Sequence, residues 1–290
     1  MFAALIAAFR RPQVLIHGRY SPWMKALGPR AAIWARIGPY EVGRTYRLGV
    51  LPTWRRRYVI PLFPQSYRTM PRPAWGLIPS REAQRVCADK GLFARFARVH
   101  GLADLTPATW SIDGPIQFPA VLKRTDLMAN RGVVIVVDAA ALAARLAEPD
   151  WRGHPVIVQE YIAGAAEETL HAVCVKGRIV WHFANVHQLD SAQSIRSAPD
   201  AVKPRASTVS VEDLALFARI FAALAYEGPA TIDFKRRPDG RIAVFEINPR
   251  LGGTLMRPEF TEQRATAVAS ILAHARLHGL GEDDFSATPQ

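Results

Sequence analysis

Two segments near the C-terminal end of the chain alternate apolar and polar residues, at residues 231–235 and 244–250. The stretch between them contains Pro238, Asp239 and Gly240, which are residue types of tight turns. Because alternating segments joined by turn residues form β-hairpins, the sequence predicts two paired antiparallel strands here. Polar side chains of the two strands would then converge on one face of the hairpin.

Three oxygen-bearing side chains occupy this predicted hairpin, namely Asp233, Glu246 and Asn248. Asp and Asn are disfavoured in strands, and burying them costs free energy, so metal binding would explain their presence. Mg²⁺ takes its oxygen ligands from one or two carboxylates, phosphates and water. We therefore predict a Mg²⁺ or Mn²⁺ site at these residues, with Arg250 as a nearby planar cation for phosphate. Solvent-facing carboxylates without a metal are the alternative.

The composition is that of a globular protein. A chain of 290 residues with 49% hydrophobic content can bury a core as one large or two small domains. Cys87 and Cys174 have no metal-binding spacing, so neither a disulfide framework nor a zinc site is expected. We find no apolar run of about 18 residues and no basic start of a secretory signal. These features favour the cytoplasm.

Positive charge is concentrated in residues 1–80. This segment holds 13 Lys and Arg residues against the single acid Glu41, which accounts for the whole net charge of +12. It also holds ten of the 22 prolines and four of the seven tryptophans. One interpretation is a surface for an anionic partner, such as a membrane, a nucleic acid or a polyanionic substrate. The other is a solvated, loop-rich segment wrapped on the main domain.

Residues 81–290 mix helical and strand patterns. Ser80 is a suitable N-cap for a helix that extends to a C-cap at Gly101. Strands are predicted at residues 118–124, 132–137, 156–162, 169–175 and 178–183, with helices at 139–146 and 211–226 and a polar loop at 188–207. A domain of the α+β class is therefore expected to begin near residue 80.

The order of these features resembles the ATP-grasp superfamily of ATP-dependent ligases. The sequence Glu-Ile-Asn-Pro-Arg at residues 246–250 is similar to the Glu-x-Asn-Pro-Arg ending of the carbamoyl-phosphate synthetase and biotin carboxylase branch. The resemblance covers about residues 81–260 and implies an α+β fold whose two small lobes clasp ATP. It places the first lobe at about residues 105–163, the second at about 164–260 and a C-terminal helix at about 261–280.

The N-terminal segment departs from the family pattern. Typical members carry an α/β domain before the ATP-binding region, and residues 1–80 are too basic, too rich in proline and too poor in glycine loops to resemble one. A degenerate form of that domain and an attachment region both stay open as interpretations. The charge would suit an acidic, bulky or membrane-associated substrate, bound peripherally at the inner membrane surface.

The resemblance assigns phosphate-binding roles to four residues. Lys123, at the end of a predicted strand, resembles the lysine that holds the nucleotide phosphates. Lys90 matches an earlier helix lysine with the same role, although a plain surface lysine is an equal alternative. Arg131 and Gly132 lie where the family has a mobile loop over the phosphates. Gly132 is the single glycine available there, so Arg131 could supply charge in place of backbone N–H groups.

The resemblance also implies where the nucleoside binds. Glu160, Tyr161 and Ile162 match the hinge whose main-chain groups contact the adenine edge, and adenine needs a flat apolar slot. Glu167 stands at the position of an acid that accepts hydrogen bonds from the ribose hydroxyls. Its neighbour Glu168 is a rival for the same role.

The activity implied by the resemblance is ATP- and Mg²⁺-dependent ligation. A substrate carboxylate would be activated as an acyl phosphate and attacked by an amine or another nucleophile, with Lys123 and Arg250 as the catalytic cations. The expected partners are small-molecule carboxylates and amines, and a homodimer is compatible with the sequence. Two other classes stay open: an ATP-binding scaffold or sensor without ligation, and a membrane- or nucleic-acid-binding protein regulated by ATP.

Overall fold

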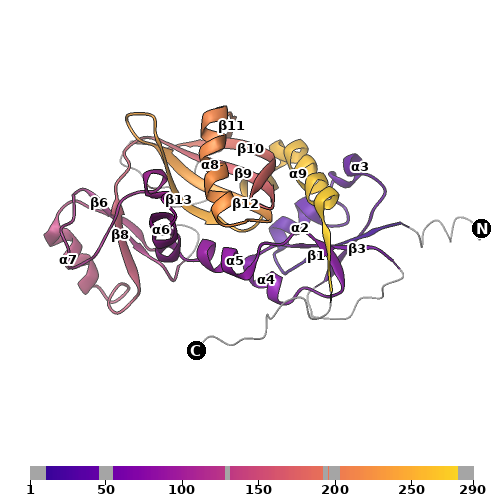
Figure 1. The fold of residues 1–290 in the computed structure, drawn as a ribbon, viewed down its shortest axis with the longest axis horizontal. Coiled ribbons are helices and arrows are strands. Elements are labelled where there is room, and N and C mark those ends of the chain that lie inside the picture. The colour runs from indigo at the N-terminus through magenta and orange to yellow at the C-terminus, as the bar shows by residue number, and fades with distance from the viewer. Residues whose placement is uncertain (1–10, 46–54, 128–130, 192–194, 196–202, 280–290) are drawn as a thin grey trace, which may run out of the picture.

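The computed structural model describes residues 11–45, 55–127, 131–191, 195 and 203–279 of the chain. In this described part the strands form three β-sheets, which follow one another along the long axis of the molecule (Figure 1). Parts of the basic N-terminal segment and of the predicted loop at 188–207 lie outside the described residues. None of the described helices has the length and hydrophobicity needed to cross a membrane.

The first sheet is built mainly from the basic N-terminal segment. Its five strands lie in the order β14-β4-β3-β1-β2. They are β1 (Gln13–His17), β2 (Glu41–Thr45), β3 (Arg57–Pro61), β4 (Ala74–Gly76) and β14 (Arg276–His278). Strand β1 is parallel to both β2 and β3, and β4 is parallel to β3. Strand β14 pairs antiparallel with β4, so the far end of the described chain completes this sheet.

Helices cover both faces of this N-terminal sheet. They are α2 (Ser21–Leu27), α3 (Trp34–Ile37), α4 (Pro64–Arg68) and α9 (Thr261–His274). Val14 and Ile16 of β1 pack in one apolar cluster with residues of α2, α3 and α9. Leu15, on the opposite face of β1, packs with Tyr67 of α4 in another. The arrangement is a small doubly wound α/β unit.

This unit differs from the expectation that residues 1–80 would not resemble an α/β domain. The central strands β1 and β3 are short continuous apolar runs because both of their faces are buried, so they lack an alternating pattern. The prolines are compatible with helices because Pro22 and Pro64 stand in the first turns of α2 and α4, where a backbone N–H is not required. Most of the arginines lie at the surface, among them Arg19, Arg36 and Arg68.

The second sheet forms the first lobe of the remaining chain. Its antiparallel strands are ordered β5-β8-β6-β7. They are β5 (Thr109–Trp110), β6 (Ala120–Arg124), β7 (Val133–Val136) and β8 (Val156–Glu160), and α7 (Ala139–Ala147) packs against them. Leu122, Val136 and Val158 form an apolar cluster with Leu142 of α7. The other face of β6, which carries Val121 and Lys123, is therefore turned away from α7.

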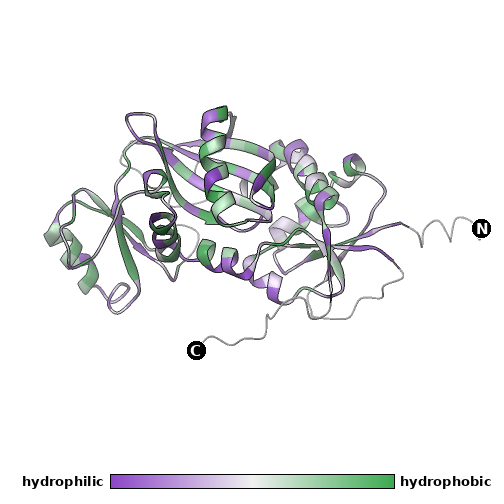
Figure 2. Ribbon diagram, viewed as in Figure 1, coloured by the Kyte–Doolittle hydropathy of each residue, from purple (hydrophilic) through white to green (hydrophobic). Residues whose placement is uncertain are grey.

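The third sheet forms the second lobe, and its antiparallel strands are ordered β11-β10-β9-β12-β13. They are β9 (Ala166–Val175), β10 (Arg178–Gln188), β11 (Arg205–Ser207), β12 (Gly228–Arg236) and β13 (Ile242–Asn248). Figure 2 shows hydrophobic residues alternating with polar ones along these strands. One face of the sheet is thus apolar and the other largely polar.

Three helices cover the apolar face of the second-lobe sheet. They are α5 (Arg81–Ala88), α6 (Lys90–Val99) and α8 (Val211–Ala223), and their buried residues join those of β9, β10, β12 and β13 in one core. Short 3-10 helices lie at η1 (Ala103–Leu105), η2 (Thr254–Met256) and η3 (Pro258–Phe260). Helix α9 packs against β9 and β10 from the other side. The rest of the polar face stays available for a ligand.

Two helices are shorter than the sequence pattern indicates. The helix expected between Ser80 and Gly101 is broken at Asp89, whose extended backbone separates α5 from α6. The Asp89 side chain accepts hydrogen bonds from the N–H groups of Gly91 and Leu92, at 2.7 and 2.9 Å, and thereby caps α6. The C-terminal helix expected to reach about residue 280 ends at His274, because the next residues extend to pair with β4.

The Asp89 cap gives a testable consequence for stability. Replacing Asp89 by Ala leaves two N–H groups at the start of α6 without their partner, so Asp89→Ala should lower the free energy of unfolding by about 1 kcal/mol. Urea denaturation followed by circular dichroism measures this. Asp113→Ala, in an exposed turn, is the matched control and should change stability by much less. Equal effects of the two substitutions would contradict the capping role.

Candidate active site

A cavity with an empty volume of about 630 Å³ lies between the two lobes. Its walls are formed by Lys90, Val121, Lys123, Val133, Glu160, Tyr161, Ile162, Glu167, Ile195, Asp233, Lys235, Phe245 and Glu246. Eight of the twelve residues predicted from the sequence to form the site are among them. Arg131, Gly132, Asn248 and Arg250 are not.

The predicted hairpin is confirmed, and it brings two carboxylates together. Asp233 of β12 stands directly opposite Glu246 of β13. The register shifts by one residue next to this pair, because Phe245 is an additional residue on β13. A bulge of this kind re-aims side chains, which explains how the consecutive residues Phe245 and Glu246 both line the cavity.

The oxygen atoms at this end of the cavity are suited to a hard divalent cation. Asp233 accepts a hydrogen bond from Thr169 at 2.8 Å, and Glu246 accepts one from the amide of Asn248 at 3.0 Å. In the described part of the chain no three His, Cys, Asp or Glu side chains cluster as a metal site. The donor set is thus two carboxylates and one amide, which fits Mg²⁺ when phosphate and water supply the remaining ligands.

Two lysines face the same carboxylates. The Nζ atom of Lys90 lies 3.6 Å from the Glu246 carboxylate and donates to the backbone oxygen of Leu127 at 3.0 Å. Lys123 is 7% exposed, and its Nζ atom lies 5.0 Å from the centre of the Phe245 ring. Burial lowers the pKa of Lys123 to about 8, although the charge of Glu246 acts in the opposite direction. Positive charge is therefore concentrated where the carboxylates meet.

A third lysine lines the cavity and was missed by the sequence interpretation. Lys235 is 4% exposed and donates to the backbone oxygen of Gly164 at 2.8 Å. Burial lowers the pKa of Lys235, and the charge of Glu167 opposes that shift. Its position two residues after Asp233 on one strand could have predicted this, because residues two apart on a strand place their side chains on the same face. Lysine near a strand end is usually solvated, so the sequence alone gave no reason to select it.

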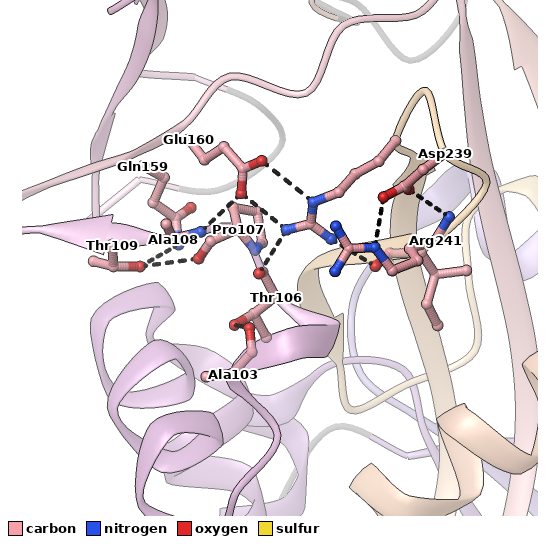
Figure 3. A network of polar contacts seen from close by, with 11 residues as sticks. Ala103, Thr106, Pro107, Ala108, Thr109, Gln159, Glu160, Asp239 and Arg241 are labelled. Carbon is pink, nitrogen blue, oxygen red and sulfur yellow. Dashed lines mark hydrogen bonds and ion pairs between the residues drawn. The ribbon is translucent and has the colours of Figure 1, made fainter. Parts of the chain in front are cut away.

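The carboxylate of Glu160 links the two lobes instead of pointing freely into the cavity. It accepts two hydrogen bonds from Arg237 of the second lobe, at 2.8 and 3.2 Å, and one from the N–H of Ala108 at 3.1 Å (Figure 3). Arg237 also donates to the backbone oxygen of Thr106 at 3.0 Å. Burial alone would raise the pKa of Glu160, but these hydrogen bonds hold it below its usual range.

The structure distinguishes between the two neighbouring acids at residues 167 and 168. Glu167 is 7% exposed and lines the cavity. Glu168 instead pairs with Arg236 at 2.8 Å, and Arg236 also binds Asp213 of α8 at 2.7 Å. Alternation along β9 therefore turns Glu167 toward the cavity and Glu168 toward the helix-covered face.

Gly132 and Arg131 form the turn between β6 and β7. Gly132 has a φ of +64°, and a side chain there would place its Cβ atom 2.9 Å from the Cβ atom of Arg124. The requirement for glycine at this position is thus explained by the turn itself. Arg131 is exposed at the same turn. Their predicted contacts with phosphate stay predictions.

Arg250 lies outside the cavity wall, in the turn that follows β13. Its guanidinium donates to the backbone oxygen of Leu251 at 3.1 Å and lies 5.3 Å from the centre of the Trp23 ring. Burial lowers the pKa of Arg250, and the charges of Asp233 and Glu246 oppose the shift. An arginine stays protonated in such surroundings, so this is a fixed positive charge near the two carboxylates.

Comparison with known proteins places this geometry in a fold family. No family model matches the chain. The large chain of carbamoyl phosphate synthase from Methanosarcina barkeri is 27% identical over 180 residues, which cover 58% of this chain and 16% of that protein. The chain thus matches only a small part of that relative.

Solved structures match over most of the chain. D-alanine–D-alanine ligase from Bacillus anthracis in complex with ATP has a TM-score of 0.57 at 17% identity, over 91% of this chain and 96% of that one. The L-amino acid ligase from Bacillus licheniformis has a TM-score of 0.58 at 14% identity, over 93% of this chain and 75% of that one. Biotin carboxylase from Campylobacter jejuni has a TM-score of 0.54 at 13% identity, over 94% of this chain and 75% of that one.

These structural matches define the fold class. The chain has the α+β ATP-grasp fold, as the sequence predicted. A coverage above 90% is more than residues 81–290 alone could provide, so the matches extend into the N-terminal sheet. The similarity to the carbamoyl phosphate synthase chain supports the branch that the Glu-x-Asn-Pro-Arg sequence indicates.

The lowered pKa of Lys123 predicts a pH dependence of nucleotide binding. Phosphate favours the charged lysine, whereas the free protein begins to lose this proton as the pH rises through about 8. Nucleotide affinity should therefore be constant below pH 8 and fall by up to about tenfold per pH unit above it. Calorimetric titration with ATP between pH 7 and 9.5 measures this. Lys123→Met should bind more weakly with a flat profile over this range; a flat profile for the unaltered protein would contradict the assignment.

The Arg237–Glu160 contact predicts that Arg237 contributes more to the free energy of unfolding than the nearby Arg241 does. Arg237→Met removes hydrogen bonds that join the lobes and should lower the free energy of unfolding by roughly 1–2 kcal/mol. Arg241→Met is the matched control, because Arg241 pairs with the exposed Asp239 at 2.6 Å on the hairpin turn (Figure 3). It should have almost no effect. Urea denaturation of both variants tests this, and equal losses of stability would rule out a special role for Arg237.

Proposed function

We propose that the protein is an ATP- and Mg²⁺-dependent ligase that activates a substrate carboxylate as an acyl phosphate for attack by an amine. The observation that carries this proposal is the pairing of Asp233 with Glu246 at one end of a cavity that also contains Lys90 and Lys123. Two carboxylates for a metal beside two cations for phosphate match the needs of phosphoryl transfer. The names of the similar structures, which include two amino acid ligases, support the same reaction class.

In this proposal the parts of ATP would follow the cavity from the hinge to the hairpin. Adenine would lie at the backbone of residues 160–162, against the apolar side chains of Val121 and Phe245. Glu167 and Lys235 would contact the ribose, because Lys235 is held next to the hinge by its bond to Gly164. The phosphates would then extend along β12 from Lys235 toward Asp233, where Lys90 and Lys123 supply positive charge.

Asp233, Glu246 and Asn248 would hold Mg²⁺, or Mn²⁺ in its place. The ion when bound neutralises charge on the phosphates. The protein's own part is to present these oxygen atoms from a paired hairpin, in which Thr169 and Asn248 already orient the two carboxylates by hydrogen bonds. Such preset orientation is what a charge-stabilising site requires.

The proposed reaction has two steps. A carboxylate oxygen of the acid attacks the γ-phosphorus of ATP, the bond to the bridging oxygen breaks, and ADP leaves with that oxygen's electron pair. An amine nitrogen then attacks the acyl carbon, phosphate departs and the amine loses a proton. Lys123 would neutralise the transferring phosphoryl group, and Arg250 would hold the acid and its acyl phosphate. No protein nucleophile is needed, since the acid itself attacks.

The remaining sequence-based expectations about partners stay predictions. An anionic or membrane-associated substrate at residues 1–80, a homodimer and a cytoplasmic or peripheral location are not tested by the fold. The scaffold and ATP-regulated binding alternatives differ from a ligase in one measurable respect. They bind nucleotide, but no acid accelerates the release of ADP.

The carboxylate pair gives a direct test of the proposed activity. ADP release is measured with MgATP and pools of carboxylic acids and amines, and new product masses are followed in parallel. Asp233→Asn and Glu246→Gln should each lower the rate by more than about a hundredfold, because each removes a charge that stabilises the phosphates. Glu212→Gln, on the exposed first turn of α8, is the control that keeps the rate.

Two outcomes would contradict the proposal in different ways. ADP release by Glu246→Gln at the unaltered rate would refute the assignment of the metal ligands. Tight ATP binding without any acid-dependent ADP release or new product would refute the ligase and support the scaffold alternative.

A further inference from the structure

The strand order of the N-terminal sheet marks a place where ligands bind. The chain passes from β1 to β2 on one side and then returns to β3 on the other side of β1. In open α/β sheets, ligands bind beyond the carboxyl ends of the strands where the order reverses in this way. Here that place is formed by the residues that follow His17 of β1 and Pro61 of β3.

Three aromatic rings gather at this reversal point. Tyr20 lies 5.7 Å from Trp23 and 5.4 Å from Phe63 between ring centres, and Trp23 stacks on Phe63 at 5.1 Å. Gly18 lets the chain after β1 pass close to α4, because its φ is +131° and a Cβ atom there would lie 2.9 Å from the Ser66 hydroxyl. We refer to Tyr20, Trp23 and Phe63 as the aromatic cluster.

The aromatic cluster is in contact with Arg250, which follows the β12–β13 hairpin. Trp23 is 7% exposed and its ring lies 5.3 Å from the Arg250 guanidinium, an arrangement that fixes the cation by its attraction to the ring face. Figure 1 shows α2, which carries Trp23, between the N-terminal sheet and the second-lobe sheet. The proposed acid-binding charge and the apolar rings thus occupy one neighbourhood.

The backbone around Arg250 is held by hydrogen bonds from the N-terminal sheet unit and from the second lobe. The Tyr67 hydroxyl of α4 donates to the backbone oxygen of Pro249 at 2.8 Å. The Thr231 hydroxyl of β12 donates to the backbone oxygen of Arg250 at 3.1 Å. One anchor comes from the N-terminal sheet unit and the other from the second lobe, so the position of Arg250 relative to the aromatic cluster is determined by both.

One ring of the cluster is available for contact. Tyr20 is 43% exposed, whereas a large aromatic side chain with two ring neighbours would normally be covered further. Arg250 is positive and half-buried, so a group that reaches it must be small and negative at one end. A group that then contacts Tyr20 must be apolar at the other end. A molecule that contacts both Arg250 and Tyr20 would therefore carry a carboxylate at one end and an apolar group at the other.

We propose that the acid activated by this protein is a monocarboxylic acid with an aromatic or bulky apolar side group, which packs on Tyr20 and Phe63 while the carboxylate faces Arg250. This inference rests on the proposed ligase function and adds the substrate class to it. It narrows the earlier expectation of an acidic, bulky or membrane-associated substrate, because the surface beside Arg250 is aromatic.

Binding and turnover are tested separately on the full-length protein. Calorimetry with Mg²⁺ and a non-hydrolysable ATP analogue measures the affinity for acetate, 3-phenylpropionate and succinate, and for alanine, leucine and phenylalanine. ADP release with MgATP is then measured for the same acids. The acids with phenyl or branched apolar groups should bind at least about tenfold more tightly than acetate, alanine or succinate.

Substitution of the exposed ring connects this preference to the aromatic cluster. Tyr20→Ala should remove most of the tenfold advantage and leave the affinity for the ATP analogue unchanged. Leu277→Ala is the control, since Leu277 is also a large exposed apolar residue, 51% exposed, but lies on β14 at the opposite edge of the same sheet. It should keep the preference of the unaltered protein.

The outcomes separate this inference from the proposed function. Tighter binding of apolar acids that depends on Tyr20, without ADP release, would support the binding site and refute the ligase. ADP release that favours small or doubly charged acids, or a preference that Tyr20→Ala leaves intact, would overturn the inference and keep the ligase. No binding and no turnover with any of the six acids would overturn both.

Discussion

The pairing of Asp233 with Glu246 across β12 and β13 is the interaction on which the site depends. Two like charges side by side in a strand pair repel each other unless positive groups compensate them. The chain supplies this compensation from separate elements, with Lys90 at the start of α6, Lys123 on β6 and Arg250 after β13. The charge balance therefore requires that the first lobe, the helix before it and the hairpin are all in place.

The junction of the lobes shows how the fold holds that charge balance together. The Arg237 guanidinium binds Glu160 at the end of β8 and the backbone oxygen of Thr106. Lys235 binds the backbone of Gly164 just beyond the same strand. Both cations come from the hairpin that also carries Asp233, so one pair of strands connects the end of β8 with the paired carboxylates. The separation between the end of β8 and Asp233 would therefore change little when a ligand binds between them.

Local patterns in the sequence predicted most helices and strands, and the resemblance to ATP-grasp ligases supplied the fold and most of the predicted residues that line the cavity. Alternation identified the hairpin, and Lys123 and Glu167 line the cavity because strand periodicity turns them inward. The N-terminal α/β unit could not be predicted in this way, since its central strands β1 and β3 are buried on both faces and show no alternation. The bulge that turns Phe245 inward and the break at Asp89 depend on tertiary pairing and capping, which composition does not reveal.

Strand β14 has a consequence for how the molecule is assembled. Its three residues pair with β4, and the entire ATP-grasp region is synthesised between these two strands. Until β14 arrives, β4 is an open sheet edge of the kind that pairs with other chains. The N-terminal sheet is therefore completed only after the two lobes that lie between β4 and β14 in the sequence have been synthesised.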